Sequence, residues 1–215
     1  MVRANFEVAR RGALGMTLAA ILLASIGGNA RAQPSDAEAV VQGLAQQVWA
    51  LLERNDLDQH SRLDELAGVL ESKTDVDLLS RLVLGRYWRR MSDEQRTGYQ
   101  ELFRAVVMRD LAMRLDRYAS DASGSVDDHF QIVGGSRVGD DDVVVRSRVI
   151  REAGKPVTVD WRLRQRPDGP VIIDLVIEGV SLLVSQRSEF ASVIERSDMD
   201  GLLAELRARA QSSRS

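Results

Sequence analysis

Two carboxylates in the last third of the chain have a spacing that acid–base chemistry can use. Asp174 and Glu178 lie four residues apart, in and just after the apolar segment 171–177. Because side chains alternate along a strand, residues four apart project to the same face. One interpretation is an active-site pair in a cavity, where burial raises carboxylate pKa values. The other is pairing with arginines or capping of a helix that begins near Ser181.

The other motifs with chemical potential fit simpler roles. The glycine-rich segment 134–139 lacks the glycine order and the lysine of a phosphate loop, so it predicts a hairpin turn between strands. Asp140–Asp142 lacks the ligand spacing of a calcium loop and predicts a solvated turn. The two histidines, His60 and His129, are interpreted as surface or loop residues. We therefore assign no catalytic residue, metal ligand or cofactor.

The composition is that of a soluble globular protein. Of its 215 residues 44% are hydrophobic and 28% are charged, and none is a cysteine. The absence of cysteine excludes disulfides, thiol nucleophiles and Cys-ligated zinc. With 29 basic and 32 acidic residues the net charge is −3, which gives no support for nucleic-acid binding.

Residues 1–32 have the pattern of an export signal. Arginines within the first eleven residues precede the apolar stretch 13–26, and A-R-A at 30–32 is a small-x-small cleavage motif. A retained membrane anchor is the alternative, because 12–30 carries no charge, but its glycines and polar residues weaken a stable span. We expect cleavage after Ala32 and export to the periplasm. Cleavage removes four arginines and one glutamate, so the net charge falls from −3 to −6.

Elements with helical periodicity fill the first half of the mature chain. Ser35 followed by Glu38, and Ser92 followed by Gln95, predict capping boxes at the starts of the first and fourth helices. Apolar side chains recur every three or four residues in four stretches. These stretches are 35–54, 58–71, 75–88 and 93–119.

From residue 126 the apolar period changes to two, which predicts strands joined by short turns. Short turns join antiparallel neighbours, so we expect a four-stranded antiparallel meander with strands at 130–133, 143–150, 157–164 and 171–177. Two closing helices, 181–196 and 199–210, precede a polar tail, 211–215, which we expect to be disordered. Helices grouped on one side of an antiparallel sheet indicate an α+β fold, here in one domain spanning 33–210.

Several segments together resemble one known family. They are L-V-L-G-R-Y-W-R at 82–89, S-D-E-Q-R at 92–96 with Phe103 downstream, I-D-L-V-I-E-G-V-S-L at 173–182, R-S-E-F at 187–190 and M-D-G-L-L at 199–203. In this order they resemble the MlaC family, also called toluene-tolerance auxiliary proteins. The resemblance covers most of the mature chain. One departure is Pro170, where family members usually have a tryptophan before the last strand.

The resemblance implies a periplasmic carrier that holds a phospholipid by its acyl chains in an apolar cavity of a curved, NTF2-like α+β fold. Such a carrier passes lipid between an outer-membrane lipoprotein complex and an inner-membrane ABC transporter with an MCE-type subunit, and so maintains outer-membrane lipid asymmetry. Soluble shuttling favours a monomer, and the task requires no catalytic group, metal or cofactor. The candidate cavity residues are Leu79, Val83, Phe103, Val106, Val107, Val145, Val149, Val159, Trp161, Ile173, Leu175, Ile177 and Leu183.

Three other interpretations fit the same residues. The cargo can be another lipid, such as a hopanoid. The cavity can belong to an enzyme that uses Asp174 or Glu178 as a general base. The apolar stripes can also be ordinary core in a periplasmic interaction module or chaperone, since core packing produces the same pattern.

Overall fold

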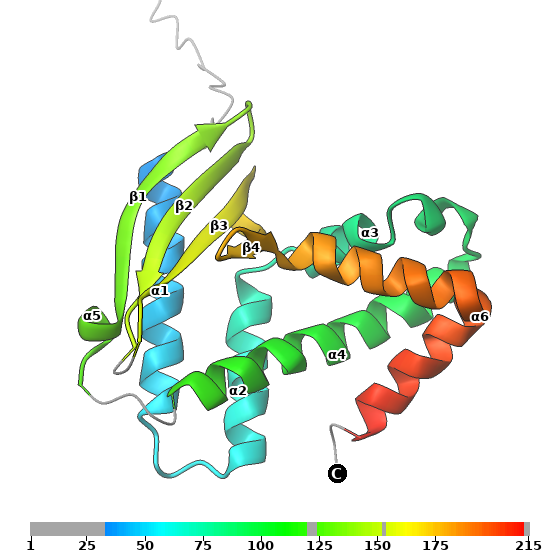
Figure 1. Ribbon diagram of the computed structural model, residues 1–215, viewed down its shortest axis with the longest axis horizontal. Coiled ribbons are helices and arrows are strands. Elements are labelled where there is room, and N and C mark those ends of the chain that lie inside the picture. Colours follow the sequence, from blue (N-terminus) through cyan, green and yellow to red (C-terminus); the bar gives the residue numbers. More distant parts are fainter. Residues whose placement is uncertain (1–32, 120–123, 152–153, 213–215) are drawn as a thin grey trace, which may run out of the picture.

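The computed structural model describes residues 33–119, 124–151 and 154–212; the predicted export signal and the last three residues of the tail lie outside them. Figure 1 shows a sheet at one end of the molecule and an arm of helices extending from it. The elements follow in the order α1 (Pro34–Leu52), α2 (Gln59–Ser72), α3 (Val76–Leu84), the 3-10 helix η1 (Gly85–Arg90), α4 (Asp93–Ala119), α5 (Val126–His129), β1 (Phe130–Val138), β2 (Asp142–Val149), β3 (Val157–Arg166), β4 (Gly169–Ile177), β5 (Val180–Ser181) and α6 (Leu182–Ser212).

The sheet is an open antiparallel meander of five strands in the order β1-β2-β3-β4-β5. The prediction of four strands is wrong because β5 was missed. Glu178 and Gly179 both have positive φ, 49° and 81°, which is the conformation of a two-residue hairpin turn. The turn pairs Val180 with Ile177. The α+β class is confirmed, and the likeness to NTF2-like folds stays a prediction.

Strand β1 is longer than expected, because most of the glycine-rich segment continues it. The register shifts between Ile132 and Gly134, and pairing then proceeds to Val138 opposite Asp142. Gly135 faces helix α1, where an added Cβ would lie 2.8 Å from the Oε1 atom of Glu38. Glycine therefore allows this part of the strand to approach the helix. The hairpin turn follows the strand instead of occupying the whole segment.

The start of α4 was predicted correctly and the start of α1 was not. Ser92 and Gln95 form the expected capping box, in which each side chain bonds the other residue's backbone N–H at 3.1 Å. Helix α1 begins instead at Pro34, with Gln33 as N-cap and no side-chain cap bond. Proline is favoured in the first turn because it has no N–H to satisfy there, so the helix starts without Ser35.

Backbone breaks limit α3 and α6. The third helix, expected to reach residue 88, ends at Leu84 because Gly85 has φ of 53°. The chain continues as the 3-10 helix η1. Within α6, Ser197 and Asp198 have non-helical dihedrals, so the two closing helices expected from the sequence are confirmed as segments on either side of this break. The second segment runs to Ser212.

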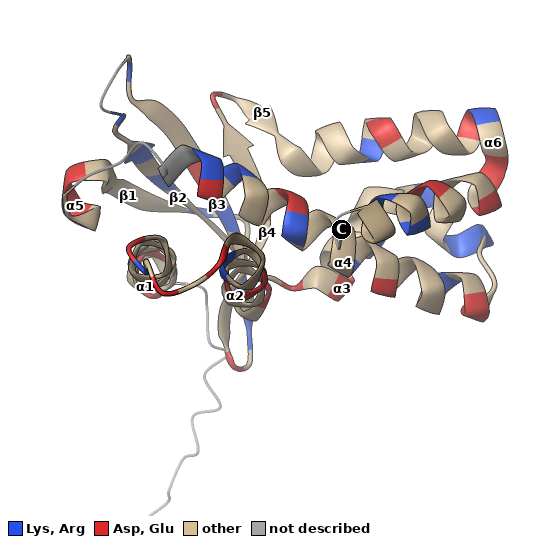
Figure 2. Cartoon of the chain, turned by 90° about the horizontal axis from the view of Figure 1, so that it is seen from below, with Lys and Arg blue, Asp and Glu red and all other residues tan. Residues whose placement is uncertain are grey.

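Helix α1 packs against β1, β2 and β4, while α4 contacts α2, α3 and α6. Figure 2 shows α1 and α2 on one side of the sheet, with α3, α4 and α6 beyond its edge. Tyr99, Phe103 and Phe190 join α4 to α6, with ring centroids 5.6 to 6.3 Å apart. The Tyr99 hydroxyl donates to the Ser80 carbonyl at 3.1 Å, and burial raises the pKa of Tyr99. The core thus ties α3, α4 and α6 together.

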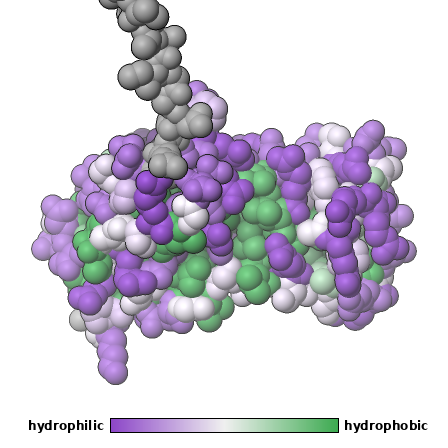
Figure 3. Space-filling model, turned by 90° about the horizontal axis from the view of Figure 1, so that it is seen from above, coloured by the Kyte–Doolittle hydropathy of each residue, from purple (hydrophilic) through white to green (hydrophobic). Residues whose placement is uncertain are grey.

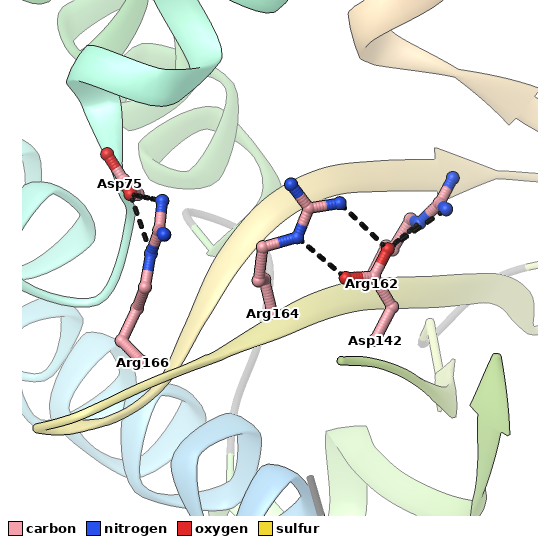
Figure 4. A network of polar contacts seen from close by, with 5 residues as sticks. All are labelled: Asp75, Asp142, Arg162, Arg164 and Arg166. Atoms are coloured by element: carbon pink, nitrogen blue, oxygen red, sulfur yellow. Dashed lines mark hydrogen bonds and ion pairs between the residues drawn. The ribbon is translucent and has the colours of Figure 1, made fainter. Parts of the chain in front are cut away.

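A charged network lies on the face of the sheet opposite α1 (Figure 4). Asp142 accepts from the Nε of Arg164 at 2.8 Å and from the Nε of Arg162 at 3.1 Å. Arg166 binds Asp75, which also accepts from the Leu78 N–H at the start of α3. The prediction that Asp142 belongs to a solvated turn is wrong, because its side chain is only 7% exposed. The network ties β2 to β3, and β3 to α3.

Candidate functional site

An apolar pocket of about 210 Å³ lies between α3, α4, β4 and α6. We call it the helix pocket. Side chains from four elements converge because the apolar stripes of α3 and α4 meet the inner face of β4 and the start of α6. Its lining is Thr74, Leu79, Val83, Phe103, Val107, Met108, Asp110, Leu111, Arg114, Ile172, Asp174, Leu175, Leu182, Leu183, Ser185, Gln186, Glu189 and Arg209. Five lining residues are charged: Asp110 and Arg114 from α4, Asp174 from β4, and Glu189 and Arg209 from α6.

A second apolar pocket of about 110 Å³, the sheet pocket, lies between the sheet and the helices α1, α2, α4 and α5. Its lining is Leu44, Ala45, Val48, Trp49, Leu52, Leu70, Leu115, Val126, His129, Phe130, Val149 and Trp161. His129 is buried, stacks on Trp49 at 4.8 Å, and places Nδ1 3.1 Å from the Ile150 carbonyl. Its assignment to the surface is therefore wrong. His60 is exposed beside Asp64, as expected.

Apolar surface lies close to the helix pocket. On the face shown in Figure 3, hydrophobic atoms gather in the middle of the molecule between two polar ends. Val180 and Val184, on either side of two residues that line the pocket, are 58% and 55% exposed. Apolar side chains that gather in one exposed patch are typical of interaction sites, whereas scattered ones are ordinary. An apolar ligand that leaves the pocket here therefore meets an apolar surface.

The comparisons with known proteins agree with this architecture. Residues 42–208 match the sequence model of the MlaC protein family. The chain belongs to the MlaC family. A phospholipid-binding protein from Ralstonia solanacearum, solved in complex with a phospholipid, is similar in structure, with a TM-score of 0.69 and 26% sequence identity. The match covers 84% of this chain and 99% of that one.

The structure of this MlaC-family chain divides the thirteen predicted cavity residues into three groups. Six line the helix pocket: Leu79, Val83, Phe103, Val107, Leu175 and Leu183. Val149 and Trp161 line the sheet pocket. Five line neither of these two pockets: Val106, Val145, Val159, Ile173 and Ile177. All of these five except Ile177 are buried, so packing accounts for their inward position.

Sequence reasoning missed two groups of lining residues. The apolar stripe of α1, with Leu44 and Val48, was not among the predicted cavity residues but borders the sheet pocket. The charged residues Asp110, Arg114, Glu189 and Arg209, which line the helix pocket, were not predicted to do so. Asp110 and Arg114 lie four residues apart on α4, so they share one helix face. This spacing was the signal in the sequence that could have indicated them.

The two carboxylates considered for acid–base chemistry bond to backbone and hydroxyl groups. Asp174 accepts from the Leu183 N–H at 3.0 Å and from the Ser181 hydroxyl at 2.6 Å, so it caps the start of α6. Glu178 is exposed in the β4–β5 turn and accepts from the Thr158 N–H. Because Glu178 lies beyond the end of β4, strand alternation does not bring it beside Asp174. This geometry gives both residues structural roles.

The described residues 33–119, 124–151 and 154–212 contain no group of three His, Cys, Asp or Glu side chains placed to hold a metal ion. None of the helices in these segments is both long and apolar enough to cross a membrane. What the pockets offer is burial of an apolar ligand. Each methylene removed from water contributes about 0.8 kcal/mol.

Proposed function

We propose that this MlaC-family chain is a periplasmic phospholipid carrier. It holds a phospholipid by its acyl chains, leaves the headgroup near solvent, and carries lipid between an outer-membrane lipoprotein complex and an inner-membrane ABC transporter with an MCE-type subunit. This traffic maintains the lipid asymmetry of the outer membrane. The observation that carries the proposal is the apolar helix pocket, in a fold similar to that of a phospholipid-bound protein from Ralstonia solanacearum.

The energetics of lipid transfer favour such a pocket. A lipid in water exposes every methylene of its acyl chains, at about 0.8 kcal/mol each. A carrier with an apolar interior replaces the bilayer environment, so exchange between membrane and protein is close to neutral. The aqueous gap is then crossed without exposing the acyl chains. Neither catalysis nor a cofactor is needed for this task.

Lipid entry requires the pockets to widen. The helix pocket, at about 210 Å³, is smaller than the roughly 300 to 1,000 Å³ of typical ligand sites. The apolar side chains of its floor come from α3, α4, β4 and α6, and they can separate without breaking a strand pair. We expect the acyl chains to occupy the helix pocket first and to reach the sheet pocket as the helices move from the sheet.

Native mass spectrometry of the mature protein, released gently from the periplasm, tests the proposal. We expect one stoichiometric adduct, and extraction of the same sample should yield phospholipid. A hopanoid in the extract would mean that the protein is a lipid carrier whose cargo is not phospholipid. A clean apo mass that gains no lipid from phospholipid vesicles would contradict the proposal and leave a core-packed interaction module as the better interpretation.

A further inference from the structure

Five charged side chains line the helix pocket. The carboxylate of Asp174 is bonded to Ser181 and Leu183, and we call the other four the rim. Asp110 and Arg114 belong to α4, and Glu189 and Arg209 belong to the two segments of α6. The apolar floor comes mainly from α3, β4 and the preceding turns of α4. A ligand with an apolar tail in the floor therefore has its polar end close to these four charges.

The charges of the rim are only partly matched with one another. Arg209 donates to Asp110 at 2.5 Å and to Glu189 at 3.2 Å. Gln186 also donates to Glu189, at 3.0 Å, and brings no charge. Two carboxylates thus face one guanidinium, and this side of the rim keeps a surplus negative charge.

Arg114 is the cation of the rim that is available to bind a ligand anion. It is exposed and, within the described part of the chain, it makes no hydrogen bond or ion pair. The other arginines of α4 are bonded to acidic side chains or to a carbonyl. Their partners are Asp93 for Arg96, Glu71 and Asp77 for Arg104, Asp64 for Arg109, and the Met113 carbonyl for Arg117.

We propose that the rim recognises a zwitterionic phospholipid headgroup, such as phosphoethanolamine. Arg114 binds the phosphate, because a guanidinium presents paired donors that match phosphate oxygens. Glu189 and Asp110 bind the cationic amine with the negative charge that Arg209 leaves unbalanced. This inference rests on the proposed function and adds a headgroup site to it. Phosphatidylglycerol offers the phosphate without the amine and is the natural comparison.

The test compares the mature chain with Arg114→Gln, Arg114→Lys and Glu189→Gln after loading from vesicles of equal phosphatidylethanolamine and phosphatidylglycerol content. Arg207→Gln is the matched control, since Arg207 is an exposed α6 arginine that lines neither pocket. Native mass spectrometry gives both the total bound lipid and the ratio of the two lipids. Thermal melting of each variant checks that it is folded.

We expect the unmodified chain and Arg207→Gln to favour phosphatidylethanolamine about threefold, the size of effect that exposed charge pairs provide. Arg114→Gln should lower both lipids about threefold, Arg114→Lys should retain part of the binding, and Glu189→Gln should remove the preference. Equal loading of the two lipids by the unmodified chain, or unchanged loading by folded Arg114→Gln, overturns the headgroup site but leaves the carrier intact. No lipid in any sample overturns the carrier itself.

Discussion

Asp142 links the stability of the sheet to pH. Burial acts to raise the pKa of its carboxyl, but the hydrogen bonds and positive charges of Arg164 and Arg162 outweigh burial and hold the pKa below its ordinary value. A carboxyl with a lowered folded-state pKa stabilises the protein above its unfolded pKa, which is near 3.9. That contribution is lost as the pH falls through the folded-state value.

We therefore expect Asp142→Asn to lower the free energy of unfolding at pH 7 by about 1.5 kcal/mol, because two guanidiniums lose a charged acceptor. The difference from the unmodified chain should shrink below about pH 4, where Asp142 itself becomes protonated. Urea unfolding at several pH values measures both effects. Asp160→Asn is the matched control, since its pair with Arg146 is more exposed and contributes less than about 1 kcal/mol. A constant difference at every pH would contradict this account.

Val107 allows a direct test of pocket occupancy. It is half-buried on α4 and lines the helix pocket, whereas Val145 and Val159 are buried core residues that line neither pocket. Val107→Trp should fill space that an acyl chain needs. Displacing two methylenes costs about 1.6 kcal/mol, which lowers lipid affinity roughly tenfold. Lipid phosphorus per mole of protein after vesicle loading measures the loss.

The control for Val107→Trp is Val138→Trp, which changes an exposed valine at the end of β1. Its lipid content should match that of the unmodified chain. Equal lipid content in a folded Val107→Trp protein would mean that the acyl chains do not enter the helix pocket.

At the scale of elements, the two serines predicted as helix caps separate clearly. Ser92 bonds the Gln95 N–H at the start of α4, so Ser92→Ala should destabilise the protein by about 1 kcal/mol. Ser35 lies inside α1 and caps nothing, so Ser35→Ala should change stability by less than about 0.5 kcal/mol. Thermal and urea unfolding of the two variants compares them, and an equal loss in both would contradict the assignment of the caps.

These elements also show which parts of the fold a sequence pattern can predict. Helix α4 was predicted with its observed bounds, because a capping box and a long apolar stripe agree over the same residues. Strand β5 has two residues, which is too short to show a period, and it depends on the Glu178–Gly179 turn. The end of α3 depends on the positive φ of Gly85, a backbone conformation that glycine permits but does not require.

At the scale of the whole molecule, the floor of the helix pocket was easier to predict than its rim. Val83, Phe103 and Val107 belong to apolar stripes that periodicity reveals within a single helix. Arg209 meets Asp110 only because α6 breaks at Ser197 and Asp198 and brings its second segment back to α4. A contact across about a hundred residues depends on that tertiary arrangement, and no local pattern carries it.

With the proposed function, lipid binding should stabilise the folded chain as a whole, because the proposed acyl-chain site lies between elements that unfolding separates. The helix pocket lies between α3, α4, β4 and α6. A lipid that occupies it therefore opposes the separation of these four elements. A ligand present at a hundred times its dissociation constant adds about 2.7 kcal/mol to the free energy of unfolding. Urea unfolding of delipidated and phospholipid-loaded protein should differ by about this amount. The gain should be smaller in Val107→Trp at the same lipid concentration, and coincident unfolding curves for loaded and delipidated protein would show that the lipid lies outside the folded core.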